Sequence, residues 1–141
     1  MFKNILAPID VTHAESSELA LNAARKLADS SGAKLTLLNI VGDVPNLVAV
    51  QLPKDYAEKA EAAAKDQLGS VAKSCGLAEG AYEVIVGSGP AYHEILAQAK
   101  KMGADLIVMA SHRPELADYL LGTVAARVVR HAKCSVLVVR E

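Results

Sequence analysis

The stretch that decides the fold is DLIVMASHRPELADYLLGTV, residues 105–124. Its first part, residues 105–109, is an apolar run of strand length, and a helical pattern starts at its end. The small and polar residues between them predict a strand-to-helix loop. Gly122 lets a ligand approach the backbone because it has no Cβ, and Thr123 is a candidate N-cap. Because the first amides of a helix are unpaired donors with partial positive charge, the loop predicts a phosphate site.

Strand-like and helical patterns alternate along the whole chain. Strands are predicted at residues 5–9, 34–41, 81–86, 105–109 and 134–139, and helices at 14–30, 54–75, 90–102 and 124–132. In the first helix, Leu19, Ala23 and Leu27 are expected to form the buried stripe, joined by neighbouring alanines. The alternation predicts one α/β domain over residues 1–141. It has an open parallel five-stranded sheet of order 3-2-1-4-5, with helices on both faces, and is Rossmann-like.

In a sheet of that order the winding direction reverses between the first and fourth strands. Ligands bind in the crevice beyond the carboxyl ends of such strands. Asp10 follows the first strand and Ser111 follows the fourth, so both arrive at this crevice. Thr12 is a candidate N-cap for the helix that follows. Residues 42–53 are a looser connection, interpreted as a flap.

Composition excludes several classes of function. The chain has 15 basic and 16 acidic side chains, for a net charge of −1, which gives no overall attraction to nucleic acid or anionic lipid. No apolar run approaches the ~18 residues of a membrane span. Cys75 and Cys134 lie far apart and outside any metal-binding spacing, so we expect reduced thiols. The N-terminus enters a strand pattern with no signal peptide, and we expect a cytoplasmic protein.

Several motifs resemble one family across nearly the whole chain. They are ILAPID at residues 5–10, DLIVMASH at 105–112, LLGT at 120–123 and VVRHAKCSVLVVR at 128–140. This pattern resembles the universal stress proteins of the adenine-nucleotide hydrolase-like superfamily. The Ser-His-Arg-Pro loop is most similar to the small UspF/UspG-type bacterial branch.

The resemblance implies a cytoplasmic homodimer that binds ATP with Mg²⁺ and acts as a nucleotide-dependent stress-response switch. The dimer is expected to form through the last strand, residues 135–139, with no nucleic-acid or membrane partner. No residue is assigned as catalytic or as a metal ligand, although weak ATP hydrolysis or autophosphorylation is compatible with the family. The nucleotide-binding residues carried over from the family pattern are Pro8, Ile9, Asp10, Ile40, Met109, Ala110, Ser111, His112, Arg113, Gly122, Thr123 and Val124.

The nucleotide signature of the family is incomplete in this chain. In ATP-binding members a Gly-x-x-Gly is followed after nine residues by Gly-Ser/Thr. Here Ala110 and Arg113 stand at the two glycine positions, and residues 114–121 leave a spacing of eight before Gly122. Arg113 either blocks the approach of phosphate to the backbone or donates its guanidinium to that phosphate.

Structural interpretations remain open beside these functional ones. Asp10 is either a ligand of the adenine or ribose edge or a loop cap. The apolar residues are either walls for the base or ordinary core, and Ser111 and Thr123 either bind phosphate or cap a helix. Two other functions are also compatible with the sequence. One is a dimeric interaction scaffold without nucleotide, and the other is an enzyme that would rely on His112 or Asp10.

Overall fold

The computed structural model describes residues 1–41, 50–111 and 122–140. Within them, five parallel strands form one sheet of order β3-β2-β1-β4-β5, as predicted. The strands are β1 (Asn4–Pro8), β2 (Lys34–Val41), β3 (Glu83–Ser88), β4 (Leu106–Ala110) and β5 (Ser135–Val139).

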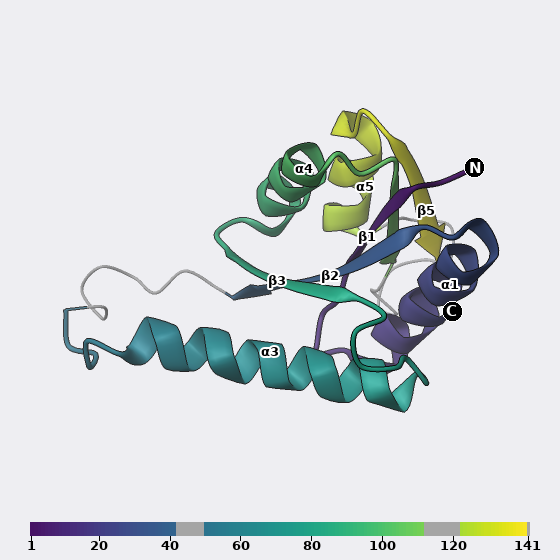
Figure 1. Cartoon of the computed structure of the whole chain (residues 1–141). Coiled ribbons are helices and arrows are strands. Elements are labelled where there is room, and N and C mark those ends of the chain that lie inside the picture. Colours follow the sequence, from purple (N-terminus) through teal and green to yellow (C-terminus); the bar gives the residue numbers. More distant parts are fainter. Residues whose placement is uncertain (42–49, 112–121, 141) are drawn as a thin grey trace.

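Helices cover both faces of this sheet (Figure 1). The described helices are α1 (Ala14–Ser31), α3 (Tyr56–Ser74), α4 (Ala91–Met102) and α5 (Thr123–His131). α1 and α3 lie on one face, and α4 and α5 lie on the other (Figure 1). Among the described residues, no helix has both the length and the hydropathy needed to cross a membrane.

Two hydrophobic cores lie on the two faces of the sheet. On one face, Leu21 and Leu68 of the helices pack against Leu37 of β2. On the other, Ile95 and Val128 pack against strand residues such as Leu6. Successive strand residues point to opposite faces, so a central strand must be apolar at every position. This explains why β1 and β4 were recognisable as continuous apolar runs.

The inward face of α1 differs from the prediction. Leu19 is 44% exposed, so its assignment to the buried stripe is wrong. The buried face is centred instead on Leu21, Ala24 and Ala28, which pack on the sheet. Leu19 lies about 200° around the helix from Leu21 at 100° per residue, which places it on the solvent side.

The pairing of the strands opens a crevice at the predicted position. β1 pairs with β2 along its whole length, from Asn4 beside Lys34 to Pro8 beside Leu38. Its pairing with β4 covers only two positions, Ile5 with Leu106 and Leu6 with Ile107. The carboxyl ends of β1 and β4 are therefore free to line a pocket between them.

Candidate functional site

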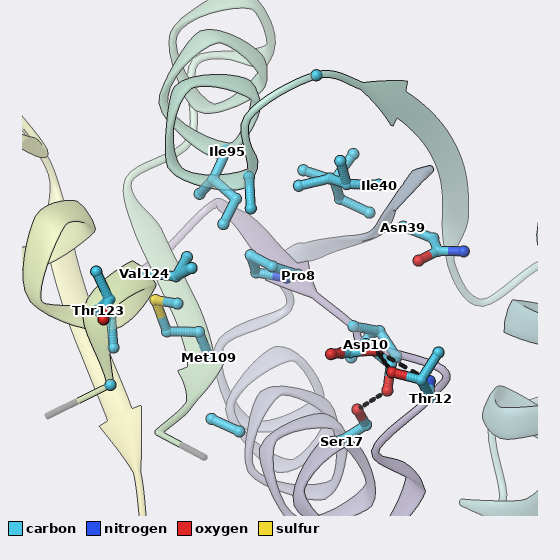
Figure 2. Close-up of a pocket in the computed structure, with 17 residues that line it drawn as sticks. Pro8, Asp10, Thr12, Ser17, Asn39, Ile40, Ile95, Met109, Thr123 and Val124 are labelled. Atoms are coloured by element: carbon cyan, nitrogen blue, oxygen red, sulfur yellow. Dashed lines mark hydrogen bonds between the residues drawn. The ribbon is translucent and has the colours of Figure 1, made fainter. Parts of the chain in front are cut away.

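A pocket of about 480 Å³ opens at the carboxyl ends of the strands (Figure 2). This volume lies in the range of small-molecule sites. Residues from β1, α1, β2, α4, β4 and α5, and from the turns beside them, form its walls. They are Pro8, Ile9, Asp10, Thr12, Ser17, Leu38, Asn39, Ile40, Gly89, Ala91, Ile95, Met109, Ala110, Gly122, Thr123, Val124 and Ala125.

The middle of the pocket is apolar. Pro8, Ile40, Ile95 and Met109 surround it in Figure 2. Met109 and Ile95 also belong to the core below α4 and α5, so wall and core are the same residues here. Ile9 lines the pocket as well, yet it packs into the core on the opposite face. The residues predicted as walls for a base are Pro8, Ile9, Ile40 and Met109, and all four line the pocket, as does Ala110.

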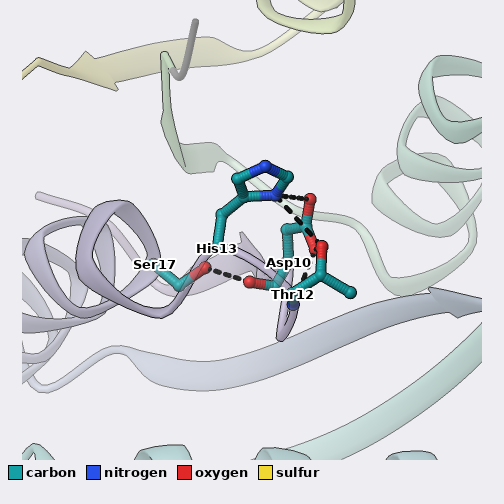
Figure 3. Close-up of polar contacts among 4 residues, drawn as sticks. All are labelled: Asp10, Thr12, His13 and Ser17. Carbon is teal, nitrogen blue, oxygen red and sulfur yellow. Dashed lines mark hydrogen bonds and ion pairs between the residues drawn. The ribbon is translucent and has the colours of Figure 1, made fainter. Parts of the chain in front are cut away.

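Asp10 anchors a group of polar side chains just after β1 (Figure 3). Its Oδ1 accepts hydrogen bonds from the Thr12 amide at 2.9 Å and the Thr12 hydroxyl at 2.5 Å. Its Oδ2 lies 2.9 Å from Nδ1 of His13. The Asp10 backbone carbonyl accepts a hydrogen bond from the Ser17 hydroxyl at 2.6 Å. The carboxylate thus holds the turn into α1, as expected of a loop cap, and Asp10 also lines the pocket.

These contacts favour the ionised carboxylate. Burial raises the pKa of Asp10, but the hydrogen bonds from Thr12 and His13 more than offset this, and the pKa lies below its usual value. Asp10 therefore presents a negative, acceptor-only group at neutral pH. The predicted N-cap role of Thr12 is wrong, because His13 is the N-cap residue and the Thr12 hydroxyl binds Asp10.

The start of α5 forms the other end of the pocket. Gly122 is the N-cap residue with extended backbone angles, and Thr123 is the first helical residue rather than the cap. The first backbone bond of the helix runs from the amide of Ala126 to the carbonyl of Gly122. Thr123 and Val124 are exposed and line the pocket. The amides of a first helical turn have no partner within the helix, so they are available to an anion here.

Ser111 lies directly after β4, beside the start of α5. The Ser111 hydroxyl accepts a hydrogen bond from the Gly122 amide at 3.2 Å. The backbone amide of Ser111 donates a hydrogen bond to the Val139 carbonyl. Ser111 therefore fixes the loop end against β5 and is not among the residues that line the pocket. His112 and Arg113 lie outside the described residues, as does most of the predicted flap, residues 42–49.

Several pocket residues were missed at the sequence level. Asn39 and Ser17 are buried polar residues. Asn39 interrupts an apolar run, and that contrast was the available signal, whereas Ser17 stands between Ser16 and Glu18 and gave none. Gly89 and Ala91 follow β3, whose carboxyl end reaches the same edge of the sheet. The described residues contain no group of three His, Cys, Asp or Glu that could hold a metal ion.

Comparisons with known proteins agree with this architecture. The family model described as "Universal stress protein family" matches residues 1–140. Universal stress protein G of Escherichia coli O157:H7 is 30% identical over 143 residues, covering 99% of this chain and 100% of the relative.

Solved structures share the fold over nearly the whole chain. Universal stress protein UspA from Lactobacillus plantarum has 28% identity and a TM-score of 0.76, covering 98% of this chain and 97% of its own. A universal stress protein solved in complex with cAMP has 25% identity and a TM-score of 0.70, with the same coverage of 98% and 97%.

Proposed function

The chain belongs to the universal stress protein family, and on that premise we propose that it binds an adenine nucleotide, ATP with Mg²⁺, in the pocket between β1 and β4. Binding would make it a nucleotide-dependent switch in a cytoplasmic stress response. The observation that carries this proposal is the position of α5. Its N-terminus forms one end of a pocket whose middle is apolar and whose other end carries hydrogen-bonding groups.

Each part of a nucleotide has a matching part of this pocket. The triphosphate would accept hydrogen bonds from the amides at Thr123 and Val124. The base would lie against Pro8, Ile40 and Met109, where apolar side chains exclude water from its faces. Nucleotide-bound Mg²⁺ is held largely by phosphate oxygens and water. That requirement fits a pocket whose described lining contains one carboxylate, Asp10.

The comparisons support the proposal at the level of nucleotide class. One structural neighbour was solved in complex with cAMP, an adenine nucleotide with a single phosphate. At 25% identity its fold covers 98% of this chain.

Isothermal titration calorimetry with Mg-ATP, ADP and cAMP tests the proposal directly. We expect saturable heat with ATP and a rise in melting temperature that increases with nucleotide concentration, because a ligand that binds only the folded state stabilises it. Mass spectrometry of small molecules released from the purified protein gives an independent readout. No heat and no thermal shift at millimolar nucleotide would refute the proposal.

A scaffold without nucleotide is the second candidate, and one contact favours it. The Ser111 hydroxyl, expected at a phosphate, already holds the Gly122 amide at 3.2 Å. If Ser111 and Gly122 only hold the backbone before α5 and bind no phosphate, the protein would act without nucleotide, and its dimer would be the functional unit. A protein that purifies as a dimer, contains no nucleotide and has the same melting temperature with and without ATP would support the scaffold.

We also propose that either form is a homodimer through β5. In the described sheet β5 is the last strand and pairs only with β4. Leu137 in its middle is 39% exposed. An edge strand with an exposed apolar side chain readily pairs with another chain. An antiparallel arrangement of two copies about a two-fold axis would cover both edges at once.

A further inference from the structure

Within the proposed function, we propose that the Asn39 carboxamide recognises the polar edge of the nucleotide base and so determines which base is bound. This inference rests on nucleotide binding in the pocket between β1 and β4. It concerns a residue that no motif of the sequence singled out.

Asn39 is a buried amide in an otherwise apolar strand end. It lies in β2 between Leu38 and Ile40, is 6% exposed and lines the pocket. Within residues 1–41, 50–111 and 122–140, its side chain makes no hydrogen bond. By contrast, Ser17 is also buried at the pocket and donates its hydroxyl hydrogen to the Asp10 carbonyl. Neither the side-chain nitrogen nor the side-chain oxygen of Asn39 is fully enclosed, so both reach the open space of the pocket. The Asn39 side chain is therefore available to a molecule in the pocket.

The position of Asn39 in the pocket points to the base rather than the phosphates. Asn39 and Asp10 lie on one side of the pocket in Figure 2, while Thr123 and Val124 lie on the other. The backbone agrees with this view, because the Ile9 amide donates to the Leu38 carbonyl at 2.8 Å. That bond keeps the chain after β1 beside the end of β2. A ligand whose phosphates bind at α5 would therefore present its base to Asn39.

The chemistry of the carboxamide fits an adenine edge. The side chain offers one acceptor and two donor hydrogens in a plane. Adenine presents its N6 amino group beside an acceptor ring nitrogen, and an asparagine forms two hydrogen bonds with such an edge. Asp10 is ionised and accepts only, so it can receive a hydrogen bond but cannot satisfy the ring nitrogen. Asn39 supplies the donor that Asp10 lacks.

The test compares ATP with purine riboside triphosphate, which lacks the N6 amino group but keeps the ring and phosphates. Wild-type protein should bind ATP about tenfold more tightly than the analogue, the loss expected when a hydrogen bond to the base is missing. In Asn39→Leu, ATP affinity should fall by about the same factor. Affinity for the analogue should change less, so that the preference for ATP disappears. Asn22→Leu makes the same chemical change on α1, outside the pocket, and should keep the preference.

Stability of the free protein provides a second readout. Because the Asn39 side chain makes no hydrogen bond in the described part of the chain, leucine breaks none there, and Asn39→Leu should melt no lower than wild type in the absence of nucleotide. A marked fall in melting temperature would mean that the amide supports the fold, and would overturn the inference. So would an Asn39→Leu protein that keeps the wild-type preference for ATP. A wild-type protein that binds neither nucleotide would instead refute the proposed function on which the inference rests.

Discussion

A negative charge placed at the start of α5 should abolish most nucleotide affinity while leaving the fold intact. The variant is Thr123→Asp, at the first residue of the helix, where the side chain is exposed and faces the pocket. Two unit charges about 5 Å apart interact by about 3 kcal/mol at an effective dielectric constant of about 20. Because Thr123 is exposed, solvent and salt reduce this repulsion. We therefore expect a loss of about 1 to 3 kcal/mol, which weakens binding about 5- to 150-fold.

The same substitution should not destabilise the free protein. An acidic residue in the first turn of a helix interacts favourably with the macrodipole, by about 0.3 to 1 kcal/mol. The expected pattern is therefore an unchanged or higher melting temperature without nucleotide, together with a weaker Kd for Mg-ATP. This combination separates an effect on phosphate binding from an effect on folding.

Calorimetric titration at two salt concentrations measures the effect. The difference between Thr123→Asp and wild type should shrink at high salt, because the repulsion is electrostatic. Tyr56→Asp is the matched control, since it adds the same charge at the first residue of α3, outside the pocket. Equal ATP affinity in Thr123→Asp and wild type would refute the placement of the phosphates at α5.

Three further outcomes follow from the structure. Asp105 accepts hydrogen bonds from the amides of Lys3 and Asn4, which depress its pKa below the usual 3.8. Its stabilisation is present above the unfolded pKa and is lost as the pH falls through the lower folded pKa. Urea unfolding should therefore show Asp105→Asn less stable than wild type at pH 7, and the difference should shrink as the pH is lowered below 3.8. Leu21→Ala, at a fully buried position, should cost about 2 to 5 kcal/mol in urea unfolding. Leu137→Asp should shift the mass measured by light scattering from dimer to monomer, and a dimer that persists would exclude β5 as the interface.

The fold was predictable because its signals are local and repeated. The central strands are buried on both faces, so each appears as a short apolar run, and the helices between them show their own period. The pairing order is less local, because the alternation is equally compatible with other doubly wound orders such as 2-1-3-4-5, and the structure shows 3-2-1-4-5. The misplacement of Leu19 shows the limit of this reasoning. A helix rich in alanine offers several possible apolar stripes, and only contact with the sheet selects one.

The pocket was predictable only in part. Asp10 follows from the rule that ligands bind at the carboxyl ends of strands where the winding reverses. Gly122 follows from the loop before a helix start, and Met109 from the family resemblance. Asn39 does not, because its burial depends on residues far away in sequence. The roles of Ser111 and Thr123 were also open, since a hydroxyl near a helix start suits both a cap and a phosphate. In the structure the Ser111 hydroxyl accepts a hydrogen bond from the Gly122 amide.

The short contact between β1 and β4 has a consequence for how the molecule could be divided. Only Ile5 and Leu6 of β1 pair with β4, so two pairings join the half of the sheet built before α4 to the half built after it. A chain cut near Gly89 would leave Asp10 and Ile40 on one fragment and Met109 and Thr123 on the other. Neither fragment would carry the complete pocket. Under the proposed function, nucleotide would therefore favour reassembly of the two fragments, and its concentration would control their complementation.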